Sequence, residues 1–280
     1  MHNIAPIARN RHLSPFRYPG GKTWLVPTVR EWVQTIAHNE SIFVEPFAGG
    51  ATVGLTAAIE KWTGHVYLSE LDHSVADVWK AVIHGNDEDL AWLYERIASF
   101  EISLSNVQEI IANGRHGSLR ERAFATIVKN RMRRGGILAA GAGLMNGGTG
   151  GNGLRSRWYP KTIIDRIQKI RAERSQITFT KDDGIKQIQR FKDRQEAIFF
   201  IDPPYTLGEK CAGRRLYDLS NINHERLFRA VAGLHGSAML TYDDNPMVRA
   251  LAARHNFHFF PIPMKSTHHA IMTELVIIKK

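Results

Sequence analysis

Residues 43–55, FVEPFAGGATVGL, decide the fold of this chain. Their apolar start predicts a strand over 42–47, the pair Gly49-Gly50 predicts a turn, and residues 51–61 predict a helix. The next apolar run, HVYLSEL at 65–71, predicts a second strand. Strand, glycine turn, helix and strand in this order form the unit with which nucleotide-binding sheets open.

Further strand patterns follow in the last third of the chain. They lie at 177–180, 197–201, 237–242, 258–263 and 273–279, and most are separated by helical patterns at 184–191, 223–233 and 246–254. The last two strand patterns have no helix between them, so we predict that an antiparallel hairpin ends the sheet. The fold class is therefore α/β, with a Rossmann-like sheet.

A mainly helical insertion divides this sheet into two halves. Residues 86–175 carry helical patterns at 87–98, 105–113, 119–133 and 162–173 without strand patterns between them. The glycine-rich stretch 136–160, with eight glycines within 136–153, predicts a loop or ribbon. We expect residues 1–85 to form the first half of the main domain, 86–175 the insertion and 176–280 the second half.

The composition is that of a folded, basic chain. Hydrophobic residues make up 43% of the 280 residues, which is enough for a full core. The net charge of +10 and the pI near 9.8 favour an anionic partner, with nucleic acid as the first candidate. One cysteine, Cys211, excludes a disulfide framework and a cysteine-rich zinc site. No signal-peptide or membrane-spanning pattern is present, so we expect a cytoplasmic protein with no membrane partner.

Asp202-Pro203-Pro204-Tyr205 follow the apolar run AIFFI at 197–201. A buried strand would deliver them to the carboxyl edge of the sheet, where ligands bind in open α/β sheets. The prolines hold their carbonyls in a stiff geometry, so the carboxylate and a carbonyl can accept the N–H groups of an exocyclic amine. Tyr205 can stack on the base, which must leave a duplex to reach such a pocket. This pattern suits transfer of a methyl group from a positively charged sulfur, without a metal.

Two further motifs fit a cofactor pocket. Phe16 to Lys22, FRYPGGK, combine aromatic rings, a turn and a lysine that can pair with a ligand carboxylate. Glu70 follows Gly50 by 20 residues, a position from which an acidic side chain accepts hydrogen bonds from ribose hydroxyls. Gly49, Gly50 and Gly54 do not match the Gly-x-Gly-x-x-Gly spacing, which disfavours a nicotinamide dinucleotide.

Together these motifs resemble the Dam-like (alpha-class) DNA adenine N6-methyltransferases. The resemblance rests on YPGGK, FVEPFAGG, SELD and IDPPY, in that order, and covers nearly the whole chain. It implies a methyltransferase sheet that uses S-adenosyl-L-methionine and carries an inserted DNA-recognition domain. It implies methyl transfer to the exocyclic N6 of a flipped-out adenine in double-stranded DNA by in-line displacement. A bacterial cytoplasm, or a phage protein acting there, and a role in restriction-modification fit this resemblance.

The resemblance also implies roles for single residues. Lys22 and the nearby aromatic rings hold the methionine part of the cofactor, and Glu70 binds the ribose. Asp183 is the acidic residue for the cofactor adenine, with Asp182 as the competing assignment. The residues expected at the cofactor are Phe16, Tyr18, Gly20, Gly21, Lys22, Glu45, Pro46, Phe47, Ala48, Gly49, Gly50, Glu70, Leu71, Asp183 and Asp202. Those expected in catalysis are Asp202, Pro203, Pro204 and Tyr205.

A basic segment within the insertion predicts the DNA contacts. Residues 115–134 hold seven Lys or Arg against one acid, Glu121. A solvated helix face is the usual explanation for such a run, but its place in the insertion favours phosphate and groove contacts. We expect contacts from Arg131, Arg133, Arg134, Arg155, Arg157, Trp158 and Tyr217. The Dam-type aromatic and Asn-rich ribbon is missing here, so the GATC target is not carried over.

Several alternatives stay open at this point. Cytosine N4 poses the same chemical problem as adenine N6, although Asp202 weighs against it because those enzymes more often resemble a Ser-Pro-Pro-Tyr pattern. A DNA-binding regulator without turnover, and an RNA substrate, are the other candidates. His268-His269 lack a third ligand at helical spacing, so we expect no metal site. The sequence does not predict an oligomeric state.

Overall fold

The computed structural model describes residues 12–280 except residue 19 and the segments 140–141, 146–152, 205–221 and 266–270. The predictions for Tyr205, Tyr217, Cys211, His268-His269 and much of the glycine-rich stretch lie outside the described residues.

The first half and the helical segment contain α1 (Val26–Ile36), β1 (Ile42–Glu45), α2 (Thr52–Ile59), β2 (His65–Ser69), α3 (His73–Trp79), the π-helix η1 (Lys80–His84), α4 (Asp87–Ser99), α5 (Leu104–Asn113), α6 (Leu119–Met132), the short helices η2 (Arg134–Gly136) and η3 (Gly153–Arg157), α7 (Pro160–Ala172) and η4 (Arg174–Gln176). The rest contains β3 (Ile177–Thr180), α8 (Gly184–Arg190), β4 (Ala197–Ile201), α10 (His224–Ala232), β5 (Ser237–Asp243), α11 (Pro246–Arg254), β6 (His258–Lys265) and β7 (Ile271–Lys279).

The described strands form one seven-stranded sheet in the order β3-β2-β1-β4-β5-β7-β6. The first five strands along the chain pair in parallel, while β7 is antiparallel to both β5 and β6. The α/β fold class and the antiparallel C-terminal hairpin predicted from the sequence are confirmed. The chain places β2 and β3 on one side of β1, then returns to place β4 on the other side. The loops after β1 and β4 therefore diverge and leave a crevice at the carboxyl edge.

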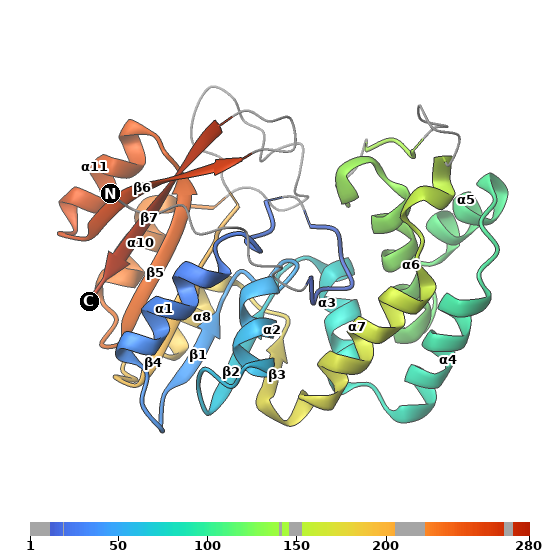
Figure 1. Cartoon of the computed structure of the whole chain (residues 1–280), viewed down its shortest axis with the longest axis horizontal. Helices are drawn as coiled ribbons and strands as arrows, with labels where there is room; N and C mark the ends of the chain where they lie inside the picture. Colours follow the sequence, from blue (N-terminus) through green and yellow to red (C-terminus); the bar gives the residue numbers. More distant parts are fainter. Residues whose placement is uncertain (1–11, 19, 140–141, 146–152, 205–221, 266–270) are drawn as a thin grey trace.

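Helices cover both faces of the sheet (Figure 1). Phe43 and Phe200 point into an apolar cluster shared with α1, α2 and α3, whereas Val44 and Phe199 point into one shared with α8, α10 and α11. Neighbouring residues on a strand point to opposite faces. Because both faces are covered, all five residues of β4 are buried, and this explains the uninterrupted run AIFFI.

The helices α4 to α7 lie to one side of the sheet (Figure 1). Their apolar residues, such as Leu93, Phe124 and Ile167, belong to the same cluster as α1, α2 and one face of the sheet. The helical segment therefore packs onto the sheet through a continuous core. The domain boundaries at 85 and 175 stay predictions.

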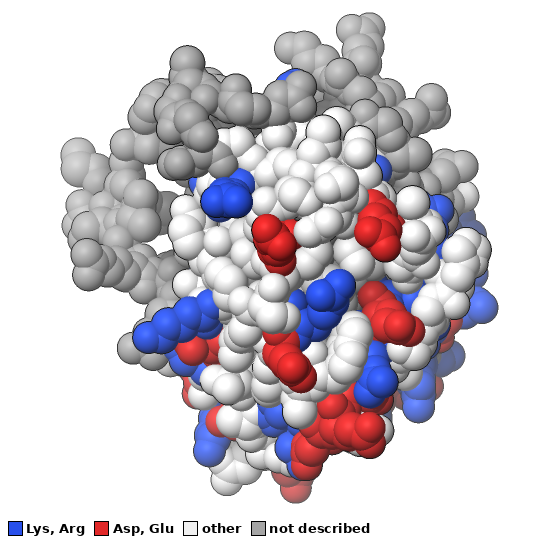
Figure 2. Space-filling view, turned by 90° about the vertical axis from the view of Figure 1, so that its right-hand side faces the viewer, with Lys and Arg blue, Asp and Glu red and all other residues white. Residues whose placement is uncertain are grey.

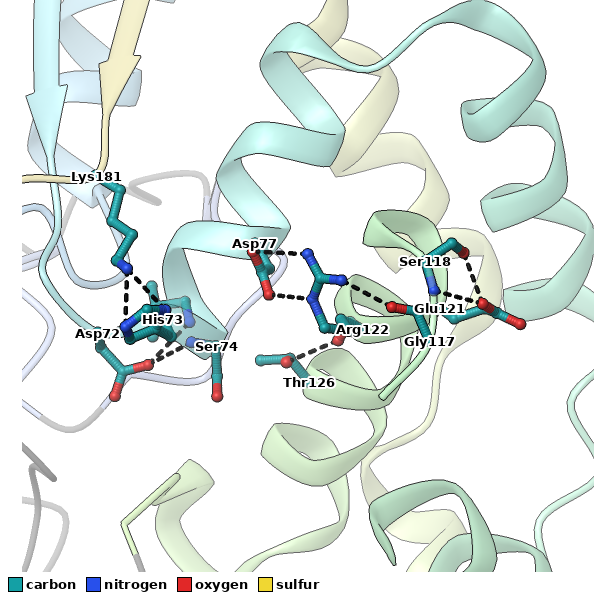
Figure 3. A network of polar contacts seen from close by, with 11 residues as sticks. Asp72, His73, Ser74, Asp77, Gly117, Ser118, Glu121, Arg122, Thr126 and Lys181 are labelled. Atoms are coloured by element: carbon teal, nitrogen blue, oxygen red, sulfur yellow. Dashed lines mark hydrogen bonds and ion pairs between the residues drawn. The ribbon is translucent and has the colours of Figure 1, made fainter. Parts of the chain in front are cut away.

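A polar contact ties α3 to α6 at the edge of this core (Figure 3). The Arg122 guanidinium lies 2.7 Å from Asp77 on α3 and donates a second bond, also 2.7 Å long, to the carbonyl of Gly117. Glu121 completes a capping box with Ser118, so α6 begins at a defined residue. Arg122 therefore connects the start of α6 to the helix that follows β2.

We predict that Arg122→Gln lowers the free energy of unfolding by about 1 kcal/mol, because a part-exposed charged pair and a carbonyl bond are lost together. Urea unfolding followed by circular dichroism measures the change. Arg115→Gln is the control, because Arg115 is exposed just before the same helix and should leave stability within about 0.5 kcal/mol of the parent. Equal stability of the two variants would contradict the role of the Asp77 contact.

Candidate active site

A cavity of about 310 Å³ opens at the carboxyl edge of the sheet. Its wall is built by the residues that follow β1, β2 and β4, among them Phe47, Glu70 and Asp202. The segment around Lys22 and the residues Gly136 to Ala139 after α6 close its sides. It is the crevice that the strand order predicts.

The glycine turn after β1 allows the N-terminal segment to pack closely against the pocket. Gly49 has φ +47°, and a Cβ placed on it would lie 2.6 Å from Cε1 of Tyr18. A Cβ on Gly50 would lie 2.8 Å from Cβ of Tyr18. Side chains at either position would therefore displace Tyr18 from the pocket wall.

Both backbone groups of Gly49, the N–H and the carbonyl, form hydrogen bonds with side chains. Its N–H donates to Oε2 of Glu70 at 2.8 Å, and its carbonyl accepts a 2.9 Å bond from the indole N–H of Trp79. The other Glu70 oxygen accepts the N–H of Asp72 at 2.8 Å, and burial raises the pKa of this carboxyl. Each carboxylate oxygen can accept two hydrogen bonds, so Glu70 keeps acceptor capacity toward the pocket.

Glu45 supplies the cap that α2 lacks. The N-cap residue, Ala51, is left-handed and has no side-chain acceptor, so the N–H of Gly54 donates instead to Oε2 of Glu45 at 2.8 Å. Glu45 is only 3% exposed, and burial raises its pKa well above the usual value. A Cβ on Gly54 would overlap the Glu45 carboxylate and Leu68. The third glycine of the motif is therefore required by this cap.

Asp202 meets a buried lysine at the end of β4. Its Oδ1 lies 3.1 Å from Nζ of Lys22 and accepts a 2.8 Å bond from the hydroxyl of Thr241 on β5. The Lys22 ammonium also contacts Oε1 of Glu274 at 3.3 Å and donates to the carbonyl of Gly20 at 2.8 Å. Lys22 is 3% exposed, and the two carboxylates raise its pKa against the opposing effect of burial. The ammonium expected at the methionine carboxylate is therefore also the counter-ion of Asp202, the aspartate expected in catalysis.

Asp183 and Asp182, the two candidates for the contact with the adenine of the cofactor, differ in position. Asp183 lines the cavity and caps α8, since its Oδ1 accepts the N–H of Lys186 at 3.0 Å. Asp182 does not line the cavity, and its Oδ1 accepts the N–H of Asp183 at 2.8 Å. The geometry favours Asp183.

The structure brings most of the predicted pocket residues to one cavity. Its wall includes Tyr18, Gly20, Gly21, Lys22, Glu45, Pro46, Phe47, Ala48, Gly49, Gly50, Glu70, Leu71, Asp183, Asp202 and Pro204. Phe16 lies behind the wall, where it packs edge-on against Trp79 with ring centroids 5.3 Å apart. Pro203 is buried beside Asp202 and does not line the cavity.

Three residues around this cavity were not singled out from the sequence. Trp79 holds the glycine turn, Thr241 orients Asp202, and Glu274 pairs with Lys22. Glu274 carried a usable signal, because it is a single acid inside the apolar strand TELVIIK. Thr241 and Trp79 have no such signal, since both residue types are ordinary at strand and helix positions.

The structure corrects the expectation that the 115–134 segment presents a free basic face. Arg120 pairs with Asp89 and Arg122 with Asp77. Lys129 is buried, as is Arg131, whose guanidinium donates to the carbonyl of Pro15. Arg133 donates to the carbonyls of Leu138 and Ala139 at 3.1 and 2.7 Å. Within the fold, these cations form ion pairs with acids of other helices or donate hydrogen bonds to backbone carbonyls.

Trp158 also lies in the interior. It is 8% exposed and packs edge-on against Phe100 and Phe124, with ring centroids 5.6 and 6.4 Å away.

Of the predicted DNA contacts in the described chain, Arg134, Arg155 and Arg157 are exposed. Figure 2 shows the side of the molecule where α4 and α5 lie, on which Lys and Arg alternate with Asp and Glu. Among the described residues on that side, cations and acids are mixed.

Cations gather instead where the N-terminal segment meets α6 and α7. Asn130 binds both backbone groups of Arg17, at 2.8 and 3.0 Å, and Arg166 donates to the carbonyl of Ser14 at 2.9 Å. Burial, Arg166 and Arg17 together lower the pKa of Arg131 to about 10. Burial and Arg157 lower the pKa of Arg17. Within the described residues, no ion pair compensates Arg17, Arg157 or Arg166.

The described residues contain neither a membrane-spanning helix nor a metal cluster. None of the helices there combines the length and the apolar character needed to cross a membrane. No group of three or more His, Cys, Asp or Glu in the same part of the chain is arranged to hold a metal ion.

Residues 18–132 match the family model of D12 class N6 adenine-specific DNA methyltransferases. The matched range includes the glycine turn, Lys22 and Glu70, and ends at the last residue of α6. None of the curated proteins matches the sequence.

Solved structures of other methyltransferases resemble the chain at low identity. A precorrin-6y C5,15-methyltransferase from Geobacter metallireducens is 10% identical with a TM-score of 0.38, over 90% of this chain and 86% of that chain. A putative RNA methyltransferase from Pyrococcus horikoshii is 10% identical with a TM-score of 0.40, over 94% and 84%. The methyltransferase domain of a bacterial Hen1 is 8% identical with a TM-score of 0.41, over 91% and 97%.

We predict that Gly54→Ala lowers the free energy of unfolding by roughly 2–4 kcal/mol, because the added methyl group displaces the buried Glu45 carboxylate from the N-terminus of α2. Urea unfolding measures the loss. Gly143→Ala is the matched control, since a Cβ there meets no atom within 4 Å, and it should change stability by less than about 1 kcal/mol. A Gly54→Ala protein as stable as the control would show that Glu45 is not needed as the cap.

Proposed function

We propose that this chain, an S-adenosyl-L-methionine-dependent methyltransferase by its D12 class match, methylates the exocyclic N6 of adenine in double-stranded DNA. The family match confirms the resemblance stated from the motifs and the cofactor expected from it. The observation that carries the proposal is the position of Asp202 in the same cavity as Gly49 and Glu70. A carboxylate that can bind the acceptor amine therefore lies in the same cavity as groups suited to bind the methyl donor.

The cavity wall fits the cofactor. The Gly49-Gly50 turn lets Tyr18 pack closely into the cavity wall, and the carboxylates of Glu45 and Glu70 line the same cavity. We infer that Glu70 binds the ribose hydroxyls and Asp183 the adenine amine, while Tyr18 packs against the ligand. When bound, S-adenosyl-L-methionine supplies a methyl group on a positively charged sulfur.

The Asp202 carboxylate prepares the acceptor. It accepts a hydrogen bond from the adenine amine, which draws the lone pair of that nitrogen out of the ring and toward the methyl carbon. With the cofactor bound, the new N–C bond would form as the S–C bond breaks, and the sulfur would keep the bonding pair. The nitrogen becomes positive, and the nearby Asp202 carboxylate stabilises this charge. One amine proton then leaves, with Asp202 as its first acceptor, and passes to water.

The uncompensated cations beside the pocket support DNA as the substrate. Arg17, Arg157 and Arg166 lie between the N-terminal segment, η3 and α7, where the mutual repulsion of positive charge favours a bound anion. Phosphate contacts hold a duplex in register and carry no sequence information. An adenine must then rotate out of the stack to reach Asp202.

We predict that Asp202→Ala lowers methyl transfer at least a hundredfold, because the acceptor loses both its hydrogen-bond partner and the charge that stabilises the product nitrogen. Transfer of labelled methyl from S-adenosyl-L-methionine to DNA measures the loss. Asp193→Asn, an exposed aspartate at 70% accessibility, is the control and should keep the parental rate. Thermal unfolding of each variant separates loss of activity from loss of fold.

Digestion of the labelled DNA to nucleosides identifies the product. N6-methyladenine supports the proposal, whereas N4-methylcytosine would establish the cytosine enzyme in its place. Labelling of RNA and not of DNA would overturn the substrate. Tight DNA binding without any transfer would favour a regulator.

We predict that Arg157→Gln and Arg166→Gln each reduce the slope of log K against log salt by about 0.9, the value expected for one lost phosphate contact on duplex DNA. Fluorescence anisotropy with a labelled duplex at several salt concentrations measures the slope. Arg190→Gln should leave it unchanged, because Arg190 ends α8 at the far side from the pocket. Unchanged slopes in the first two variants would remove this surface from the DNA interface.

A further inference from the structure

Glu274 lies inside the sheet, behind the pocket. On β7 it pairs with Asp243 of β5 on one side and Ile262 of β6 on the other. Its side chain is buried, with Oε1 3.3 Å from Nζ of Lys22. Oε2 is also buried and has no hydrogen-bond partner among the described residues. Burial of a carboxyl group with one oxygen left without a hydrogen bond costs stability, so a functional role for Glu274 is worth considering.

The contact with Lys22 connects Glu274 to the reacting end of the pocket. The ammonium lies between Glu274 and Oδ1 of Asp202, at 3.3 and 3.1 Å. Lys22 and Asp202 line the cavity, and Glu274 does not. Glu274 therefore acts on the substrate only through Lys22 and through its charge.

We propose that Glu274 is a positioning residue for methyl transfer, which anchors the Lys22 ammonium against Asp202 from β7 and adds negative charge behind the acceptor nitrogen. This inference rests on the proposed function. An ionised Glu274 holds the ammonium from the side of the sheet, so that Lys22 stays within reach of Asp202 at the cavity wall. Its charge also favours the nitrogen that becomes positive as the methyl group arrives.

The protonation of Glu274 makes the inference testable near neutral pH. Burial raises its pKa, Lys22 lowers it, and Asp202 and Asp243 raise it, which together bring the pKa to about 7. These three are the charged groups of the described residues that act on it from the N-terminal segment, the end of β4 and β5. Between pH 6 and 8 the carboxyl thus passes from mostly neutral to mostly ionised, and we expect kcat to rise with it.

The experiment compares Glu274→Gln with the parent by kcat and KM from pH 6 to 8. Glutamine has the same shape and no charge, so it should match the parent within about twofold at pH 6 and fall roughly tenfold below it at pH 8. The inflection near pH 7 should disappear from the variant. The KM for S-adenosyl-L-methionine should stay within about threefold, because Glu274 does not line the cavity. Glu60→Gln, a carboxylate in a surface pair with Arg30, should keep the parental profile.

A second readout does not depend on activity. A group whose folded pKa lies above its unfolded one adds stability that is full below the unfolded pKa and is lost as pH rises through the folded pKa. For Glu274 this loss falls between about pH 4.5 and 7. The parent should therefore lose more melting temperature than Glu274→Gln between pH 5 and 8. Calorimetric titration with S-adenosylhomocysteine should give equal affinities for both proteins.

The outcomes separate the inference from the function on which it rests. If the parent methylates no adenine, the proposed function fails, while the melting profiles still report whether Glu274 titrates near neutral pH. If the parent methylates adenine and Glu274→Gln shows the same pH profile, the positioning role is overturned. A variant with the pH inflection intact but a weaker affinity for S-adenosylhomocysteine would also overturn it, because Glu274 would then shape the cofactor site. Glu274→Asp, which keeps the charge, should recover part of the pH 8 rate.

Discussion

The ammonium of Lys22 is the contact on which the site depends. It joins the N-terminal segment, the residue after β4 and the antiparallel strand β7, three parts that are distant in sequence. Without this cation, Asp202 and Glu274 would face each other in a buried place, where unpaired charges are strongly destabilising. The same ion pair orients Asp202 toward the cavity, so one buried charge serves both the fold and the proposed chemistry.

The cofactor side of the pocket is held by hydrogen bonds to backbone. Glu45 caps α2, Glu70 holds the N–H of Gly49, and Trp79 holds its carbonyl. These bonds hold the glycine turn and the start of α2 in place, so this wall of the pocket is preorganised. Gly49 and Gly54 are needed for different reasons. The first has a left-handed backbone under Tyr18, and the second leaves room for the Glu45 carboxylate.

The helical segment is tied to the pocket through the N-terminal chain. Asn130, Arg131 and Arg166 bind the backbone of residues 14–17, and the next residues along the chain line the cavity. A displacement of α6 or α7 would therefore move the N-terminal segment that carries Tyr18 and Lys22. Of the basic residues of α6, Arg131 serves this attachment, while Arg120 and Arg122 pair with acids of α4 and α3.

The sequence by itself determined the strands, their helices, the terminal hairpin and the motif residues of the pocket, because apolar periodicity and glycine or proline punctuation are local signals. Four short motifs in a fixed order also carried the resemblance to the adenine methyltransferases, whose family model matches residues 18–132. Only the tertiary structure decided that Lys22 pairs with Asp202 and Glu274, and that Arg122 and Arg131 are used inside the fold. It likewise favoured Asp183 over Asp182. A charged residue looks the same in sequence whether its partner is a distant acid, a buried carbonyl or a phosphate, and that partner is known only when the elements have packed.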